Sequence, residues 1–425
     1  MSPRPPGPRA ERDEGAVGVR RTAALVTAGV LALLSGCTGG ADDGAPAAST
    51  TSSSAAASSS AATSTATPTP AVPPQVHLVP ADGAADVAPA GPVEISVTAG
   101  EVADVSVTDA AGAPVPGRLA DGTTDGTRVW TPDEDLGYGA TYTLTAAATN
   151  ADGERAEARS TFTTATPDAL AVPAIGPLDG ETVGVGMPIR VFFDRPVTDR
   201  AAVESHLLVT SSTPTDGVWS WVGDTEVHFR PSRYWPAETD VTLHADLRGV
   251  PFGDGVYGER DRTVSFRVGE RHVSVADAGT HRLQVFDGDV LVQDFPMSAG
   301  APQTPSYDGA HVVTELNAER VMDSSTYGVP VDSPGGYRTP VRWAVRISDS
   351  GEFVHGAPWS VAQQGRENVS HGCINLSTED ARWFYEFSRP GDVVEIRGSG
   401  AGTLTSAIAD WTIPWQEWRA GSALG

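Results

Sequence analysis

The chain has 425 residues and a formal net charge of -25, from 29 basic and 54 acidic side chains. A nucleic-acid partner requires a basic surface that neutralises phosphates, so this charge argues against one. At roughly 150 residues per domain, the length predicts about three domains. Short runs of Val, Thr and Ile, separated by many of the 46 glycines and 33 prolines, favour strands and turns, so the expected fold class is mainly β.

The N-terminal segment combines Arg20 and Arg21 with an apolar run over residues 22–34, which leads into Leu-Ser-Gly-Cys at Cys37. The run is shorter than the ~20 residues of a membrane-spanning helix, which favours a signal-peptide core. Its ending resembles a bacterial lipobox. This resemblance implies that Cys37 becomes the lipidated first residue of the mature protein, anchored on the extracytoplasmic face of the cell membrane. An ordinary secretion signal, in which Cys37 has no role, is the alternative.

Residues 38–72 consist almost entirely of Ala, Ser, Thr, Gly and Pro. Such a segment has too few large apolar side chains to offset chain entropy, so we expect a disordered linker. Residues 1–37 are thus predicted to be the lipoprotein signal peptide with its lipobox, and residues 38–72 to hold a folded part away from the membrane.

Two consecutive stretches, residues 73–167 and 168–269, contain many short Val- and Thr-rich runs separated by turn residues. This spacing is typical of antiparallel sandwiches. The stretches also align with each other, because Pro-Ala-Asp-Gly at 80–83 matches Pro-Leu-Asp-Gly at 177–180. We therefore predict two tandem immunoglobulin-like β-sandwiches that act as spacers.

The pattern changes over residues 270–398, which contain further apolar runs with strand character. Asp-Gly at 287–288 predicts a hairpin. Ser377 with Asp380 is a capping-box signal for one short helix. We expect a mainly β catalytic domain with one short helix after the nucleophile, and an aromatic tail over residues 399–425 that packs on the second module.

The candidate nucleophile is Cys373, the only cysteine outside the N-terminal segment. A thiol is mostly protonated near neutral pH, and an imidazole that accepts the proton raises the thiolate fraction. His371 would share a strand face with Cys373, whereas His355 arrives from another strand, and both are candidates for the base. Gly372 lets backbone N–H groups approach a reacting carbonyl. A structural zinc site would need more ligands than one cysteine and two histidines, and a buried structural cysteine is disfavoured by the two histidines.

These residues resemble the catalytic motif of the L,D-transpeptidases, the YkuD family of peptidoglycan cross-linking enzymes. The family motif is a histidine, a spacer and Ser/Thr-His-Gly-Cys-x-Asn, which stands here as His355, residues 356–369 and Ser-His-Gly-Cys-Ile-Asn at 370–375. The likeness extends to the segments at 322–330 and 336–339. With the two sandwiches and the lipobox, the chain resembles the mycobacterial lipoprotein-type members.

The resemblance implies that Cys373 attacks the carbonyl between the third and fourth residues of a donor tetrapeptide stem, with His355 as base. D-Alanine departs, and the donor stem remains bound to Cys373 as a thioester. The diaminopimelate amine of a second stem then attacks this thioester to form a 3→3 cross-link, without cofactor or metal. The resemblance also implies acylation by carbapenem β-lactams. His371 and Gly372 join the catalytic set, with the Gly372 and Cys373 N–H groups and the Tyr337 hydroxyl as oxyanion site. The implied substrate-binding residues are Tyr337, Tyr327, Met322, Gly356, Trp359, Ser370 and Asn375, with the Gly356 carbonyl holding His355.

Two alternatives remain open at this point. An L,D-carboxypeptidase would resolve the same thioester with water, and the motif cannot separate it from a transpeptidase because the difference lies in water exclusion. A cell-wall-binding scaffold with a silent thiol is the other alternative. Residues 319–337, rich in Ser, Gly and Pro, are predicted to form a lid over the cleft.

Overall fold

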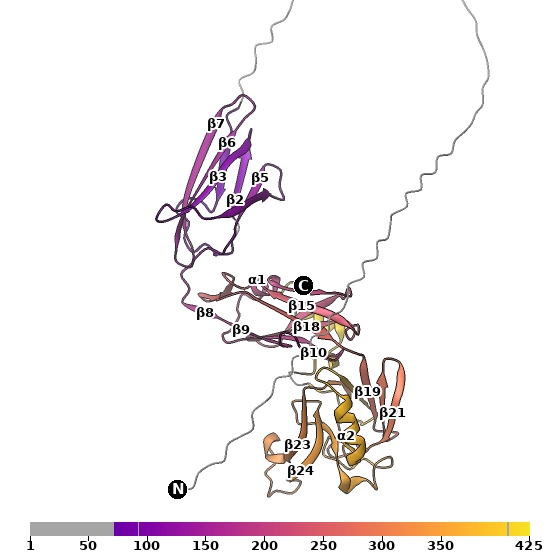
Figure 1. Cartoon of the computed structure of the whole chain (residues 1–425). Coiled ribbons are helices and arrows are strands. Elements are labelled where there is room, and N and C mark those ends of the chain that lie inside the picture. The colour runs from indigo at the N-terminus through magenta and orange to yellow at the C-terminus, as the bar shows by residue number, and fades with distance from the viewer. Residues whose placement is uncertain (1–71, 92, 406–407) are drawn as a thin grey trace, which may run out of the picture. The chain divides into compact units, whose positions relative to one another are not determined.

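The computed structural model describes residues 72–91, 93–405 and 408–425, and this part of the chain is mainly β, as predicted (Figure 1). The predicted signal peptide, Cys37 and nearly all of the predicted linker lie outside the described residues. Three successive groups of strands follow one another, each built around a hydrophobic cluster. In the described ranges, no helix has the length and apolar character needed to cross a membrane.

The first group is a sandwich of two antiparallel sheets, ordered β1-β2-β5-β4 and β3-β6-β7. Its buried cluster includes Ile95, Trp130, Leu144 and Phe162, which come from both sheets. The strands are β1 (Gln75–Val79), β2 (Val93–Thr98), β3 (Glu101–Asp109), β4 (Gly117–Asp121), β5 (Thr127–Pro132), β6 (Thr141–Thr149) and β7 (Arg155–Thr163).

The second group has sheets ordered β13-β14-β11-β9 and β10-β18-β15-β12, with a small third sheet, β16-β17-β8. The aromatic side chains Trp219 and Trp235 are buried in its core. Its elements are β8 (Ala169–Ala171), β9 (Pro173–Gly176), β10 (Thr182–Val183), β11 (Ile189–Phe193), α1 (Arg200–Ser205), β12 (Leu207–Ser211), β13 (Gly217–Trp221), β14 (Glu226–Pro231), β15 (Thr239–Ala245), β16 (Pro251–Gly253), β17 (Val256–Gly258) and β18 (Arg262–Val268).

The internal repeat appears in the hydrogen bonds of the two aligned Asp-Gly turns. In the first sandwich, Asp82 Oδ1 accepts a hydrogen bond from the Thr161 N–H at 2.8 Å. In the second, Asp179 Oδ1 accepts one from the Ser265 N–H, also at 2.8 Å. In both cases the donor lies on the last strand of its sandwich, β7 or β18. In each module, the Asp-Gly turn is therefore hydrogen-bonded to the last strand.

The third group contains two sheets, ordered β21-β20-β19-β27-β22 and β23-β24-β25-β26. Strands β25 and β26 run parallel, and their register places His355 opposite Asn375. The predicted N-cap of the helix is present: Ser377 Oγ accepts from the Asp380 N–H at 3.1 Å and donates to the Asp380 carboxylate at 2.8 Å. The elements are β19 (His272–Asp277), β20 (Arg282–Asp287), β21 (Val290–Pro296), β22 (Gly309–Val312), β23 (Glu315–Asp323), η1 (Ser324–Tyr327), β24 (Arg338–Arg346), β25 (Phe353–Gly356), η2 (Pro358–Ser360), β26 (Ile374–Leu376), α2 (Thr378–Phe387), β27 (Val393–Arg397), η3 (Asp410–Thr412) and α3 (Trp415–Ala420).

The span predicted as a lid, residues 319–337, is only partly a loop. Its first residues belong to β23, which pairs antiparallel with β24 from Glu315 to Asp323. This pairing satisfies backbone N–H and C=O groups that a free lid would leave to water. The short helix η1 follows, capped by the Asp323 side chain, and the connection from 328 to 337 leads into β24.

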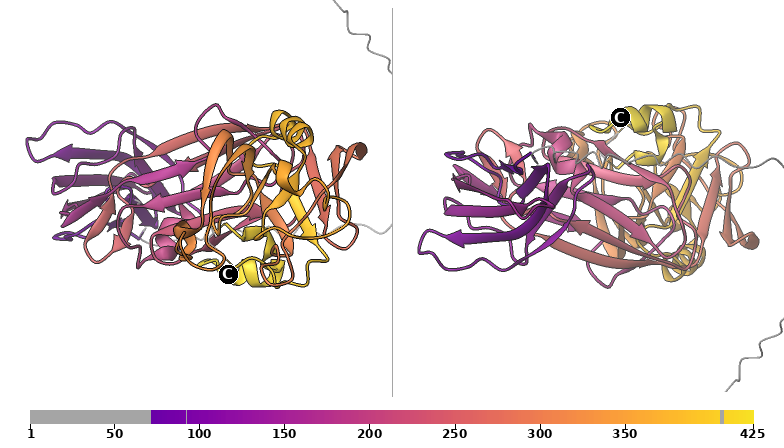
Figure 2. Two further views of the ribbon diagram at one scale, coloured as in Figure 1. Left: turned by 90° about the horizontal axis from the view of Figure 1, so that it is seen from below. Right: turned by 90° about the horizontal axis from the view of Figure 1, so that it is seen from above.

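The C-terminal residues pack on the second sandwich. Helix α3 contacts β13, and in both views of Figure 2 the yellow C-terminal helix lies beside magenta strands of that sandwich. Trp418 is 1% exposed, and its Nε1 donates to the Val218 carbonyl at 2.9 Å. The Arg230 guanidinium lies 4.6 Å from the ring centroid of Trp418, a cation–π contact.

A buried histidine links the same tail to the sandwich. Nδ1 of His228, on β14, lies 2.9 Å from Asp410 Oδ1, and its Nε2 lies 2.6 Å from Glu226 Oε1. Burial opposes a charge on the ring, but hydrogen bonds to the two carboxylates outweigh burial and raise the pKa of His228. The Arg190 guanidinium, whose Nε lies 3.1 Å from His228 Nε2, opposes the charge as well.

Candidate active site

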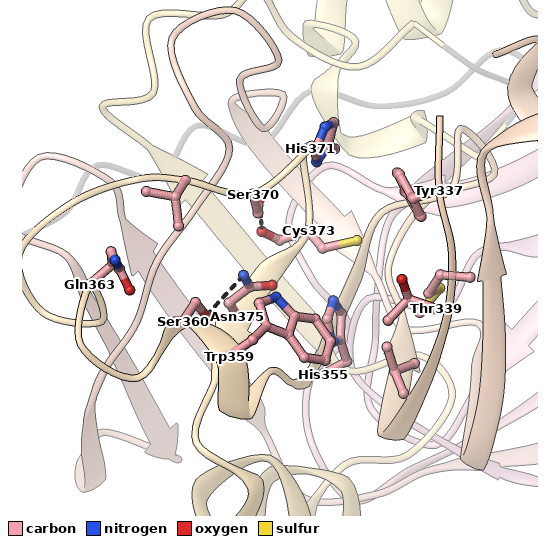
Figure 3. Close-up of a pocket in the computed structure, with 13 residues that line it drawn as sticks. Tyr337, Thr339, His355, Trp359, Ser360, Gln363, Ser370, His371, Cys373 and Asn375 are labelled. Carbon is pink, nitrogen blue, oxygen red and sulfur yellow. Dashed lines mark hydrogen bonds between the residues drawn. The ribbon is translucent and has the colours of Figure 1, made fainter. Parts of the chain in front are cut away.

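A cavity of about 360 Å³ opens beside Cys373, and most of the predicted site residues line it (Figure 3). Its walls come from β23, β24, β25, η2 and the segment leading into β26. The lining residues are Met322, Tyr337, Thr339, Val341, His355, Trp359, Ser360, Gln363, Val369, Ser370, His371, Cys373 and Asn375.

Cys373 is the only cysteine among the described residues, and it lies immediately before β26. Its residue exposure is 7%, and its Sγ lies 3.8 Å from the Gly351 carbonyl oxygen. Burial raises the pKa of the Cys373 thiol to about 12; the Phe353 backbone N–H lowers it and the Glu352 carboxylate adds to the rise. The resting nucleophile is therefore a protonated thiol, which requires a base for its activation.

His355 projects from β25 into the same cavity as the Cys373 sulfur (Figure 3). Its Nδ1 lies 3.1 Å from the Gly356 carbonyl oxygen. Because a carbonyl oxygen only accepts hydrogen bonds, Nδ1 carries the proton and Nε2 is left as the basic nitrogen. Burial lowers the pKa of His355, although the Gly356 carbonyl works against this. The ring is thus a neutral base at neutral pH.

Ser370 holds the nucleophile segment in shape. Its Oγ donates to the Cys373 carbonyl oxygen at 2.6 Å and accepts from the Gly372 N–H at 3.1 Å. Gly372 has a φ of 115°, a left-handed conformation that favours glycine. The Gly372 N–H, predicted as an oxyanion donor, is thus already hydrogen-bonded to Ser370. The Cys373 N–H has no acceptor within the described part of the chain, which leaves it as the backbone donor at this site.

Most of the remaining predicted residues lie around this centre. Tyr337 and His371 have ring centroids 5.2 Å apart, and Trp359 lies 6.1 Å from the His355 ring. Asn375 donates from Nδ2 to Ser360 Oγ at 3.2 Å. Met322, on β23, is buried in the cavity wall, Gly356 lies on β25, and Tyr327 belongs to η1.

Several lining residues were missed by sequence reasoning. Ser360 and Gln363 follow Trp359 through η2 and the turn after it, which fold back toward the cavity. The signal was present, because a Pro-Trp-Ser sequence just after the base favours a tight turn. The other missed residues are Thr339 and Val341 on β24, and Val369 before the motif.

Two protein families match this chain, one over the sandwiches and one over the part that contains the cavity. The L,D-transpeptidase catalytic domain family matches residues 271–396, and the bacterial Ig domain family matches residues 84–251. L,D-transpeptidase 2 of Mycobacterium tuberculosis is 42% identical over 344 residues, covering 80% of this chain and 83% of that protein. The chain belongs to the L,D-transpeptidase family.

Two further relatives are also proteins of Mycobacterium tuberculosis. L,D-transpeptidase 5 of Mycobacterium tuberculosis is 39% identical, covering 84% of this chain and 78% of that protein. The crystal structure of L,D-transpeptidase 3 from Mycobacterium tuberculosis, in complex with a faropenem-derived adduct, is 34% identical with a TM-score of 0.46. That comparison covers 54% of this transpeptidase and 98% of the other chain.

Proposed function

We propose that this transpeptidase forms 3→3 peptidoglycan cross-links through a thioester on Cys373. The observation that supports this most directly is that the Cys373 thiol and the His355 imidazole line a single cavity. The imidazole tautomer is set by the Gly356 carbonyl, so its proton-accepting nitrogen is Nε2. This pair supplies a nucleophile and its base, and the chemistry needs no cofactor.

In the first half-reaction, Cys373 Sγ attacks the carbonyl carbon between the third and fourth residues of the donor stem. The thiol proton passes to His355 Nε2 as the C–S bond forms. The Cys373 N–H and the Tyr337 hydroxyl stabilise the negative charge that develops on the carbonyl oxygen. The imidazolium then gives its proton to the leaving nitrogen, the peptide bond breaks, and D-alanine departs.

In the second half-reaction, the diaminopimelate amine of an acceptor stem attacks the thioester carbonyl. His355 takes a proton from the amine, the C–S bond breaks, and the sulfur regains a proton. Water in place of the amine would give an L,D-carboxypeptidase. His371, whose ring lies beside Tyr337 at the cavity wall, together with Asn375, Trp359, Met322 and Ser370, would shape the stem-binding pocket. Tyr327, on η1, is a further candidate from the family resemblance alone.

The experiment that tests this proposal is mass spectrometry of the purified protein with a disaccharide-tetrapeptide and, separately, with a carbapenem. We expect a covalent adduct with each, and a stem dimer that lacks one D-alanine. Cys373→Ala should lose both adducts while keeping its circular dichroism spectrum. Cross-linking retained in Cys373→Ala would refute the mechanism. Free tripeptide as the only product would indicate the carboxypeptidase. The absence of any adduct would favour the cell-wall-binding scaffold.

We also propose that Cys37 carries a lipid anchor that holds the enzyme on the extracytoplasmic face of the membrane. The support is the apolar run that ends in Leu-Ser-Gly-Cys. Cys37→Ala expressed in a bacterial host should shift from the membrane fraction to the soluble fraction and lose the mass of the lipid. An unchanged distribution would favour an ordinary secretion signal.

A further inference from the structure

A buried carboxylate that the proposed mechanism does not use lies behind the nucleophile. Glu352, in the turn between β24 and β25, is 5% exposed. Its Oε1 accepts a hydrogen bond from the Tyr307 N–H at 2.9 Å, but its Oε2 has no hydrogen-bond partner among the described residues. Burial raises the pKa of this carboxyl. An unpaired buried charge is costly, so the position requires a counter-charge.

His311 on β22 supplies that counter-charge. Its side chain is fully buried, with Nδ1 3.2 Å from the Ile347 carbonyl oxygen and Nε2 2.9 Å from the Tyr307 carbonyl oxygen. Carbonyl oxygens only accept hydrogen bonds, so both ring nitrogens face acceptors, an arrangement that favours the doubly protonated ring. Glu352 Oε2 lies 3.8 Å from Nδ1, within ion-pair distance. With the ring doubly protonated, the two side chains form a buried pair of opposite charges.

Glu352 also lies beside the nucleophile segment. A Cβ placed on Gly372 would lie 3.6 Å from Glu352 Cγ and 3.8 Å from its Oε1, so the Glu352 side chain is a close neighbour of this glycine. The loop that Glu352 holds at Tyr307 reaches the same glycine, because Ser306 Oγ donates to the Gly372 carbonyl oxygen at 2.6 Å. Glu352 thus fixes a loop whose hydroxyl fixes the peptide unit between Gly372 and Cys373.

We propose that Glu352, balanced by His311, is a positioning residue that turns the Cys373 N–H toward the reacting carbonyl. In a trans peptide the C=O and N–H point in opposite directions, so a Gly372 carbonyl held by Ser306 directs the Cys373 N–H to the other side. The inference rests on the proposed role of Cys373 as the nucleophile. It assigns a function to two buried charges that lie outside the catalytic motif.

The groups that face Glu352 determine whether a substitution raises or lowers the thiolate fraction of Cys373. His311 from β22 and Cys373 from the nucleophile segment are the titratable groups facing it, and the hydroxyls of Ser348 and Ser350 lie on its own turn. The carboxylate raises the pKa of the Cys373 thiol. Glu352→Gln should therefore increase the thiolate fraction, whereas His311→Gln, which leaves the carboxylate unbalanced, should decrease it.

The first test is the rate of Cys373 alkylation by iodoacetamide between pH 7.5 and 9.5. The full-length protein is used, and peptide mass spectrometry follows the peptide that contains Cys373. We expect the rate to rise about 3–10-fold in Glu352→Gln, to fall by about as much in His311→Gln, and to return near the wild-type value in the double variant. Glu386→Gln, which removes an exposed carboxylate paired with Arg382 on α2, is the matched control.

Single variants that shift the rate in the same direction, or that both match the control, would overturn the proposal. The alkylation rate requires no transpeptidation, so this result is separate from the success or failure of the proposed function. A change in packing alone would not give opposite shifts that cancel in the double variant.

The second test separates position from charge. Glu352→Gln keeps an oxygen for the Tyr307 N–H, whereas Glu352→Ala does not, so carbapenem acylation should be about tenfold slower in the alanine variant. Equal acylation rates at equal melting temperature would overturn the positioning role. If a Glu352 variant fails to fold, Ser306→Ala breaks the bond to the Gly372 carbonyl and leaves both charges in place. It should slow acylation and leave the alkylation rate unchanged; any other pattern contradicts the proposal.

Discussion

Replacing His355 by asparagine tests how the buried thiol loses its proton. Burial raises the pKa of Cys373 to about 12. At pH 7 such a thiol is ionised in only ~1 molecule in 100,000, against ~3% for an ordinary thiol with a pKa of ~8.5. A mechanism that waits for free thiolate would therefore be slow, and transfer of the proton to His355 during the attack avoids this limit. Loss of a general base lowers a rate by about 100- to 10,000-fold, and we expect a fall of this size in His355→Asn at pH 7.5.

The pH profile gives the sharper result. In the wild-type enzyme, the lowered pKa of His355 keeps the base neutral, so acylation should fall only below the ordinary histidine value of ~6.5. In His355→Asn, acylation should instead rise about tenfold per pH unit up to pH 10, because free thiolate remains scarce throughout that range. The assay is stopped-flow measurement of carbapenem acylation, with His371→Gln as the control that keeps the wild-type profile shape. A plateau between pH 8 and 9 in His355→Asn would refute the reasoning, since it would reveal an ordinary thiol.

Two further predictions concern the contact between the tail and the second sandwich. Trp418→Ala should lower the free energy of unfolding by about 3–5 kcal/mol in a urea titration, because the ring is 1% exposed. The control is Trp359→Ala, at a 57% exposed site, which should lower it by less than ~0.5 kcal/mol. Similar losses in the two variants would contradict this prediction. The raised pKa of His228 gives stability that is fully present below ~6.5 and lost as the pH rises through the folded-state value. The urea midpoint of His228→Gln should therefore fall further below wild type at pH 6 than at pH 9.5, and equal deficits at the two values would exclude the ion pair.

The parts of the site that sequence could predict are those encoded by neighbouring residues. Ser370, Gly372 and Cys373 lie within four positions, so their hydrogen bonds depend on local conformation alone. The helix after them was likewise signalled by Ser377 and Asp380, which cap it within one turn. His355 required one tertiary step, the parallel pairing of β25 with β26. The family motif supplied that step because it specifies both residues together.

The charges behind the nucleophile could not be predicted in this way. His311 and Glu352 meet only because β22 and the turn before β25 converge on the Ser306 loop. Neither residue belongs to a motif, and a charged residue in a turn is normally exposed to solvent. The expectation that residues 319–337 form one long loop was partly wrong for a related reason. Residues 319–323 have no strong strand signal of their own, and their strand exists because β24 offers it a partner.

The resting state of the site agrees with the compartment proposed for this enzyme. Oxidants and alkylating agents attack thiolates, and a thiol with a pKa near 12 presents almost none in the absence of substrate. A thiolate–imidazolium pair would react faster with any electrophile, but outside the cell it would also oxidise faster. Here the thiol and the imidazole both rest neutral, and charge develops only when an acyl donor occupies the cavity and the oxyanion donors can stabilise it. The buried pair of His311 and Glu352 fits this arrangement, because it holds the Cys373 N–H in place without adding net charge beneath the sulfur.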